Sequence, residues 1–116
     1  MTNPDIDVER RLPLAPAVLH ILIALGEGEK HGYAVMQEVA ERTDGKVRMS
    51  PGTLYGSIRK MLDDGLIAES FRPADDERRR FYRVTKFGRA VAAAEADRLA
   101  SLLRHARLTG LVPRKS

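Results

Sequence analysis

Three observations predict a mainly α-helical protein with a small β-hairpin and one long C-terminal helix. Apolar residues recur at helical spacing in four segments of the chain. Two short runs, 66–72 and 80–84, are rich in β-branched and aromatic residues and flank a polar stretch. The length of 116 residues suits a single domain with one appended element, since domains typically run about 100 to 150 residues.

The first part of the chain predicts an arm and two helices. Residues 1–12 show no periodicity, so we expect a flexible N-terminal arm, followed by a compact domain over 13–84. The first helix runs from Pro16 to the glycines at 26 and 28, with Val18, Leu19, Leu22, Ile23 and Leu25 as its apolar positions. A second helix is expected from about His31 to Thr43, with Tyr33, Val35, Met36, Val39 and Ala40 facing inward.

The third helix has the strongest start signal in the sequence. Ser50 can accept a hydrogen bond from a free backbone amide, and Pro51 is tolerated at the first helical position. Its core-facing stripe consists of Leu54, Ile58, Met61 and Leu62. The other faces carry small, hydroxyl and basic residues without an acid before Asp63. We therefore expect this helix to present a surface to a partner.

A hairpin and a long helix complete the chain. In the strand over 80–84, Phe81 and Tyr82 point to opposite faces, so one of them should be in the core. The long helix, over 85–110 and capped by Thr85, would reach about 38 Å at ~1.5 Å per residue, farther than a small core is wide. We expect its unpaired stripe to form a two-fold dimer through Val91, Ala94, Leu99, Leu102, Leu103 and Ala106. Residues 111–116 are expected to be a loose basic tail.

The positive charge is concentrated in two windows of the sequence. Residues 46–60 and 78–89 contain ten basic residues and no acid, whereas the overall net charge is +4, which leaves −6 for the rest of the chain. The alternative is that both windows are solvent-exposed surfaces without a binding partner. Their concentration instead favours binding of a polyanion.

Enzyme and membrane classes find no support in the residues. Without cysteine the chain has no disulfide and no thiolate ligand or nucleophile. Its three histidines, His20, His31 and His105, lack metal-ligand spacing, and no nucleophile is paired with a base. We therefore expect no enzyme activity, no metal and no cofactor. The longest apolar stretch, 15–25, is too short to cross a bilayer and no signal-peptide pattern is present, which favours a cytoplasmic protein.

Three helices followed by a hairpin is the element order of a winged helix-turn-helix domain. In that geometry the third helix enters the major groove of DNA, and the hairpin, or wing, would lie over the phosphate backbone. The two basic windows fall on these two elements. Charge and topology thus point to the same surface.

Four ordered motifs strengthen this interpretation. His31-Gly32-Tyr33, Ser50-Pro51-Gly52-Thr53-Leu54-Tyr55, Asp64-Gly65-Leu66-Ile67 and the run from Arg80 to Gly88 resemble the PadR family of bacterial transcriptional regulators. The resemblance covers roughly residues 14–90. It implies a dimeric winged-helix repressor with a C-terminal dimerisation helix, often released by a small-molecule effector.

The predicted DNA-binding residues lie in the two basic windows and at the front of the third helix. They are Lys46, Arg48, Ser50, Gly52, Thr53, Tyr55, Ser57, Arg59, Lys60, Arg78, Arg79 and Arg80. Ser50 could instead serve only as a helix cap, and Tyr55 could be a core ring. Arg59 is the candidate for reading bases, because arginine can bridge guanine with two bonds. In the wing, the acids at 75–77 compete with DNA for the arginines.

These inferences predict a homodimeric, sequence-specific regulator, more specifically a repressor, that binds a pseudo-palindromic operator in double-stranded DNA. The alternative is a winged-helix module that binds protein or a ligand and not DNA, because fold does not fix function. The two acid-free basic windows favour the DNA-binding hypothesis.

Overall fold

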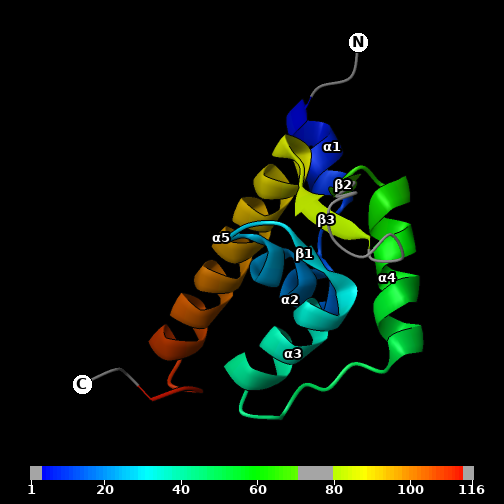
Figure 1. Cartoon of the computed structure of the whole chain (residues 1–116). Coiled ribbons are helices and arrows are strands. Elements are labelled where there is room, and N and C mark those ends of the chain that lie inside the picture. The colour runs from blue at the N-terminus through cyan, green and yellow to red at the C-terminus, as the bar shows by residue number, and fades with distance from the viewer. Residues whose placement is uncertain (1–3, 71–79, 114–116) are drawn as a thin grey trace.

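The computed structural model describes residues 4–70 and 80–113 (Figure 1). Its helices and strands follow the order α1 (Pro4–Arg10), α2 (Pro16–Leu25), β1 (Lys30–His31), α3 (Gly32–Arg42), α4 (Pro51–Asp63), β2 (Ile67–Ser70), β3 (Phe81–Val84) and α5 (Lys86–Leu108). This is the predicted mainly helical architecture with a small antiparallel sheet and a long C-terminal helix.

Three helices begin at side chains that cap them. Ser50 Oγ accepts a hydrogen bond from the backbone N–H of Thr53 at 3.1 Å, and Thr85 Oγ1 accepts one from Gly88 at 2.9 Å. His31 Nδ1 accepts from the Ala34 N–H at 3.2 Å and begins α3. Each bond satisfies one of the donors that a helix start leaves free. The histidine at this position is therefore structural, as the sequence indicates.

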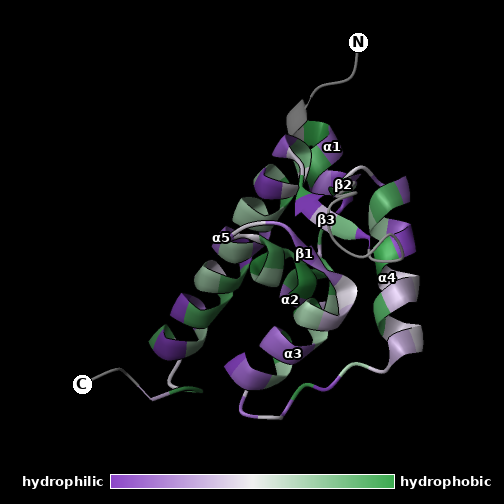
Figure 2. Ribbon diagram, in the orientation of Figure 1, coloured by the Kyte–Doolittle hydropathy of each residue, from purple (hydrophilic) through white to green (hydrophobic). Residues whose placement is uncertain are grey.

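The hydrophobic core surrounds α2. This helix packs against α3, α4 and α5, and most of its length is hydrophobic (Figure 2). Its side chains Ile21 and Leu25 meet Val35 from α3, Leu54 from α4 and Val91 from α5, all of them at most 1% exposed. Of the stripe predicted for the third helix, Leu54, Ile58 and Met61 are buried, and Leu62 is half-buried and packs against the core.

The sheet has three strands, where the sequence predicted a two-stranded hairpin. Its order is β1-β3-β2, and β1 pairs antiparallel with β3 through Lys30 opposite Tyr82 and His31 opposite Phe81. A strand of two residues carries no period-2 pattern that a sequence could reveal. Tyr82 is buried, whereas Phe81 is half-buried with its ring edge-on to His31 at 5.6 Å. The prediction that one of these two rings is in the core is confirmed.

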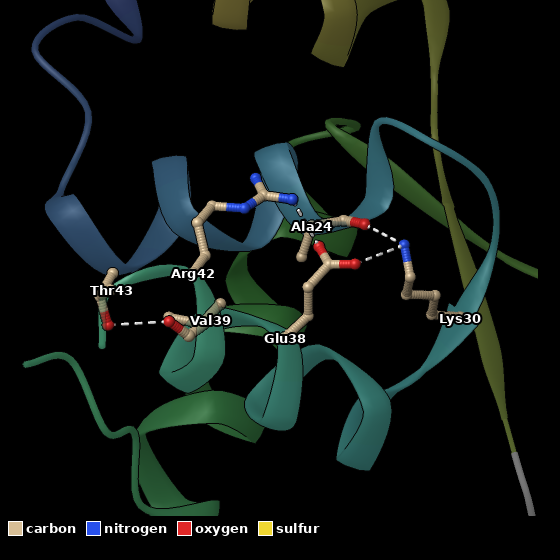
Figure 3. Close-up of polar contacts among 6 residues, drawn as sticks. All are labelled: Ala24, Lys30, Glu38, Val39, Arg42 and Thr43. Atoms are coloured by element: carbon tan, nitrogen blue, oxygen red, sulfur yellow. Dashed lines mark hydrogen bonds and ion pairs between the residues drawn. The ribbon is translucent and has the colours of Figure 1, made fainter. Parts of the chain in front are cut away.

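Tertiary contacts hold β1 in place. Lys30 Nζ donates to the carbonyl oxygen of Ala24 at the end of α2 and forms an ion pair with Glu38 of α3 at 3.2 Å (Figure 3). Arg42 binds the other oxygen of the same carboxylate at 2.9 Å. The short strand is therefore tied to two helices by one side chain.

Part of the N-terminal arm differs from the sequence prediction. Residues 4–10 form the helix α1, which packs against α5, with Val8 against the core. A helix of seven residues is not stable alone, because helix nucleation is costly. Its packing partner, α5, lies far away in the sequence, so no local pattern predicts it.

Two residues of the predicted apolar patterns are exposed, and one of them, Tyr33, was expected to face inward. Ile23 of α2 is 43% exposed and Tyr33 of α3 is 59% exposed. Both lie at the edge of an apolar stripe, and helical spacing alone does not decide which edge of a stripe meets another helix.

None of the helices in the described ranges combines the length and hydrophobicity that crossing a membrane requires.

Candidate nucleic-acid interface

The front of α4 is an exposed polar edge. Ser50, Gly52, Thr53 and Tyr55 are all exposed, and Ser57 is half-buried. The Ser50 hydroxyl caps the helix and also donates to Thr53 Oγ1 at 3.1 Å. Ser50 is therefore a helix cap. Because its side chain is exposed, it can also contact a phosphate.

Gly52 has no packing reason to be a glycine. A Cβ built on it would meet only Ser50 Oγ, at 3.9 Å, which is an ordinary van der Waals distance. Glycine inside a helix costs about 0.5 to 1 kcal/mol relative to alanine. The fold itself would therefore accept a side chain here, and the bare backbone suits close approach by a partner.

Tyr55 is a surface ring and not a core ring. It is 48% exposed, and its hydroxyl lies 2.8 Å from where a Cβ at Gly32 would be. The ring therefore covers the first residue of α3, which links the two helices of the helix-turn-helix.

Burial, together with the Glu69 carboxylate, raises the pKa of the neighbouring Tyr82 phenol, which stays neutral.

Three cations of the first basic window are unpaired within the described residues. Lys46 and Arg48, in the connection before α4, and Arg59 on the helix are all exposed, and no carboxylate of the described ranges pairs with them. Lys60 differs, because its Nζ lies 3.6 Å from Asp64. An exposed pair of this kind contributes at most about 1 kcal/mol, so Lys60 can exchange its partner.

The wing is only partly described. Arg80 is exposed and pairs with Glu69 on the neighbouring strand at 3.3 Å. The sequence pointed only to the acids at 75–77 as competitors for the wing arginines. Arg78 and Arg79, with the acids at 75–77, lie outside the described residues. The strands themselves position the wing beside α4, because β2 packs against that helix.

Tyr33 is an exposed side chain that sequence reasoning placed in the core. It lies in the first turn of α3. In helix-turn-helix proteins the first of the two helices crosses the DNA backbone, so the phenol is a candidate phosphate donor. The signal that could have identified Tyr33 as exposed is its position directly after His31-Gly32, in the first turn of the helix.

The C-terminal half of α5 exposes an apolar surface. Leu99, Leu102 and Leu103 are 42%, 53% and 43% exposed, while Ala94 and Ala106 are half-buried. Val91 does not belong to this surface, because it is fully buried in the core of its own chain. Val91 is therefore removed from the predicted dimerisation stripe, and Leu99, Leu102 and Leu103 are the members that the chain itself leaves exposed.

The start of α5 is joined tightly to the end of α4. Thr85 Oγ1 donates to the carbonyl oxygens of Gly65 and Leu66, at 2.6 and 3.0 Å. A Cβ on Gly88 would lie 2.0 Å from the Leu66 carbonyl oxygen, a distance that no side chain can adopt. This close packing fixes the start of α5 on the connection between α4 and β2.

No group of three or more acidic, histidine or cysteine side chains within 4–70 and 80–113 is arranged to hold a metal ion.

Comparisons with known proteins agree with this architecture. The family described as "Transcriptional regulator PadR-like family" matches residues 19–94. The transcriptional regulator Rv3488 of Mycobacterium tuberculosis is 36% identical over 95 residues, which cover 82% of this chain and 86% of the relative.

Two solved structures share the fold. A PadR family transcription regulator from Clostridium difficile has a TM-score of 0.72 at 18% identity and covers 82% of this chain and 98% of its own. A transcriptional regulator from Clostridium thermocellum has a TM-score of 0.71 at 20% identity, over 92% and 96% of the two chains.

Proposed function

This chain belongs to the PadR-like family of transcriptional regulators, and we propose from that premise that it is a homodimeric repressor that binds a specific sequence in double-stranded DNA. The family is one of regulators, which is not a class of enzyme. The single observation that carries the DNA-binding proposal is the exposed edge of α4, where hydroxyls and a bare glycine backbone lie together with cations that have no acidic partner among the described residues.

The residues of this edge divide by their chemistry. Lys46 and Arg48 precede α4 and supply positive charge for phosphates, whereas Thr53 and Arg59 carry donors that can reach base edges. Gly52 removes the side chain that would hold the backbone away from the groove. Arg80 adds a phosphate contact from the wing when it exchanges Glu69 for DNA.

The apolar surface of α5 supports the dimer. Leu99, Leu102 and Leu103 lie beyond the part of α5 that the core covers. Each is about half exposed, so burying the remainder in a dimer contributes roughly half of the ~1.5 to 3 kcal/mol that full burial of a leucine gives. A two-fold axis along this surface would place the two α4 helices in successive major grooves, about 34 Å apart. Such a dimer requires an operator with two inverted half-sites.

Repression relieved by a small-molecule effector is the regulatory part of the proposal. The resemblance noted in the sequence suggests it, and the packing of Gly88 on Leu66 supports it. Because that contact fixes the start of α5 on the connection that follows α4, a ligand that shifts one helix would also move the other.

The experiment is selection of bound duplexes from a random pool by the full-length protein, followed by sequencing and by titration across a salt series. The proposal predicts enrichment of an inverted repeat, with a Kd that rises steeply with salt. A protein-binding or ligand-binding module without DNA function would enrich nothing and would elute from random duplex at low salt.

A further inference from the structure

A pocket lies along one flank of α4, between this helix and the N-terminal segment. It has a volume of about 480 Å³ and is bounded by the end of α1, the segment that leads into α2, and α4. Ligand sites in proteins typically measure about 300 to 1,000 Å³. The pocket is therefore large enough for a small organic molecule, and it shares a wall with the proposed recognition helix.

The pocket combines an apolar wall with excess positive charge. Leu14, Val18, Met61 and Leu66 contribute the apolar side chains. The charged residues are three cations, Arg10, Arg11 and Lys60, and one acid, Asp64.

One carboxylate forms ion pairs with two of these cations. Asp64 lies 3.5 Å from Arg11 and 3.6 Å from Lys60, and Arg10 pairs with no acid in the described part of the chain. The formal charge around the pocket is thus positive by two. A bound anion would give the excess cations a partner and make short, charge-assisted hydrogen bonds.

Gly56 enlarges the pocket without a reason in the fold. It lies in the middle of α4 and lines the pocket, and a Cβ built on it would meet no atom within 4 Å. Alanine at a helix interior is favoured over glycine by about 1 kcal/mol. The missing side chain lowers helix stability and leaves open space where the pocket is.

We propose that this pocket binds an amphipathic organic anion, with its apolar body against Leu14, Val18 and Met61 and its acidic group on Arg10 and Arg11. Bound there, the ligand lies against Ser57 and Lys60, two residues of the predicted DNA-binding set, and it would therefore compete with DNA for this flank of α4. The binding itself requires no DNA. Its use as the effector site rests on the proposed function, because only a DNA-binding α4 can be regulated in this way.

The test uses two dyes that share one ring system. 8-Anilinonaphthalene-1-sulfonate carries a sulfonate, and N-phenyl-1-naphthylamine is its uncharged counterpart. Fluorescence titration of the full-length protein without DNA gives a Kd for each dye. In the variant Arg10→Gln with Arg11→Gln, the Kd of the sulfonate dye should rise about tenfold or more, since charged hydrogen bonds are lost. The Kd of the neutral dye should change less than twofold.

Filling the pocket supplies an independent variant. Gly56→Met places a side chain in the open space and should weaken binding of both dyes, with thermal unfolding confirming that the variant folds. If Gly56→Met unfolds, Gly56→Ala, which meets no atom within 4 Å, replaces it with the same expected direction. Arg104→Gln, which removes an exposed cation of α5, is the control and should change neither Kd.

Unchanged dye affinities in both the arginine and the Gly56 variants would overturn the proposal, because these dyes also bind exposed apolar surface elsewhere. A loss of the neutral dye equal to that of the sulfonate dye in the arginine variant would overturn the anion specificity. Failure to select any operator would contradict the proposed function, whereas the dye-binding result would remain valid. The two proposals can thus fail separately.

Discussion

The carboxylate of Glu95 accepts a hydrogen bond from the backbone N–H of Leu14 at 2.9 Å, across 81 positions of sequence. Glu95 is only 2% exposed, and Arg98, one turn along α5, bonds both of its oxygens, at 2.5 and 3.1 Å. This contact fastens the segment that follows α1 to the long helix. It also fixes one wall of the pocket beside α4, because Leu14 lines that pocket.

Replacing Glu95 tests this fastening. Glu95→Ala should lower the free energy of unfolding by about 1 to 3 kcal/mol, because the partly buried Leu14 N–H loses its acceptor. Glu95→Gln keeps an acceptor oxygen and should lose less. Urea unfolding of the three proteins at pH 7 checks the order, and equal stabilities for Glu95→Ala and the parent would contradict it.

The same carboxylate predicts a pH dependence of stability. The hydrogen bonds from Arg98 hold the pKa of Glu95 below its ordinary value of 4.5, against the opposing effect of burial. A carboxylate with a lowered folded-state pKa stabilises the fold above its unfolded-state pKa, and this stabilisation is lost as the pH falls through the folded-state pKa. The difference in Tm between the parent and Glu95→Gln should therefore be largest near neutral pH and shrink in acid. A difference that stays constant from pH 7 to pH 3 would argue against the lowered pKa.

Gly88 and Gly56 are a matched pair of helical glycines with opposite surroundings. Gly88→Ala should cost about 1 to 3 kcal/mol of stability or more, because the new Cβ would meet the Leu66 carbonyl oxygen at 2.0 Å. Gly56→Ala should instead gain up to about 1 kcal/mol, because the space is open. Parallel denaturant titrations measure both changes. Equal effects at the two positions would show that α5 does not pack on Leu66 as described.

Leu99→Glu tests the proposed dimer. A charge in the apolar surface of α5 should give monomers by light scattering and weaken operator binding by at least about tenfold, since two linked half-sites bind far more tightly than one. Ala93→Glu introduces the same charge in the row of Arg89 and Asp97, and it should leave the dimer intact. If Leu99→Glu remains dimeric, the interface lies on another surface.

The wing should contribute affinity without sequence preference. Arg79→Ala with Arg80→Ala should weaken binding to operator and random duplex alike, and the salt slope should fall by roughly 0.9 for each phosphate contact removed. Arg104→Ala on α5 serves as the control with an exposed cation away from α4 and the wing. Loss of operator preference alone, with random duplex bound as before, would assign the wing to base reading instead.

Local signals in the sequence determined most of the elements of this protein. Ser50-Pro51 and Thr85 fixed two helix starts, the stripe from Leu54 to Met61 fixed the buried side of α4, and the two basic windows indicated the elements of the proposed nucleic-acid interface. Each of these depends on neighbours within about four residues, which is the range over which helix caps and helical faces are decided.

Tertiary structure alone decided the contacts between distant segments. β1 exists because β3 pairs with it and Lys30 bridges α2 and α3, and α1 exists because α5 supports it. Val91 is in the core and Leu99 is exposed on the same stripe of one helix, since only the first half of α5 meets the core. Glu69 beside Arg80, and the pocket between Arg10 and Gly56, likewise arise from segments that the fold brings together across the sequence.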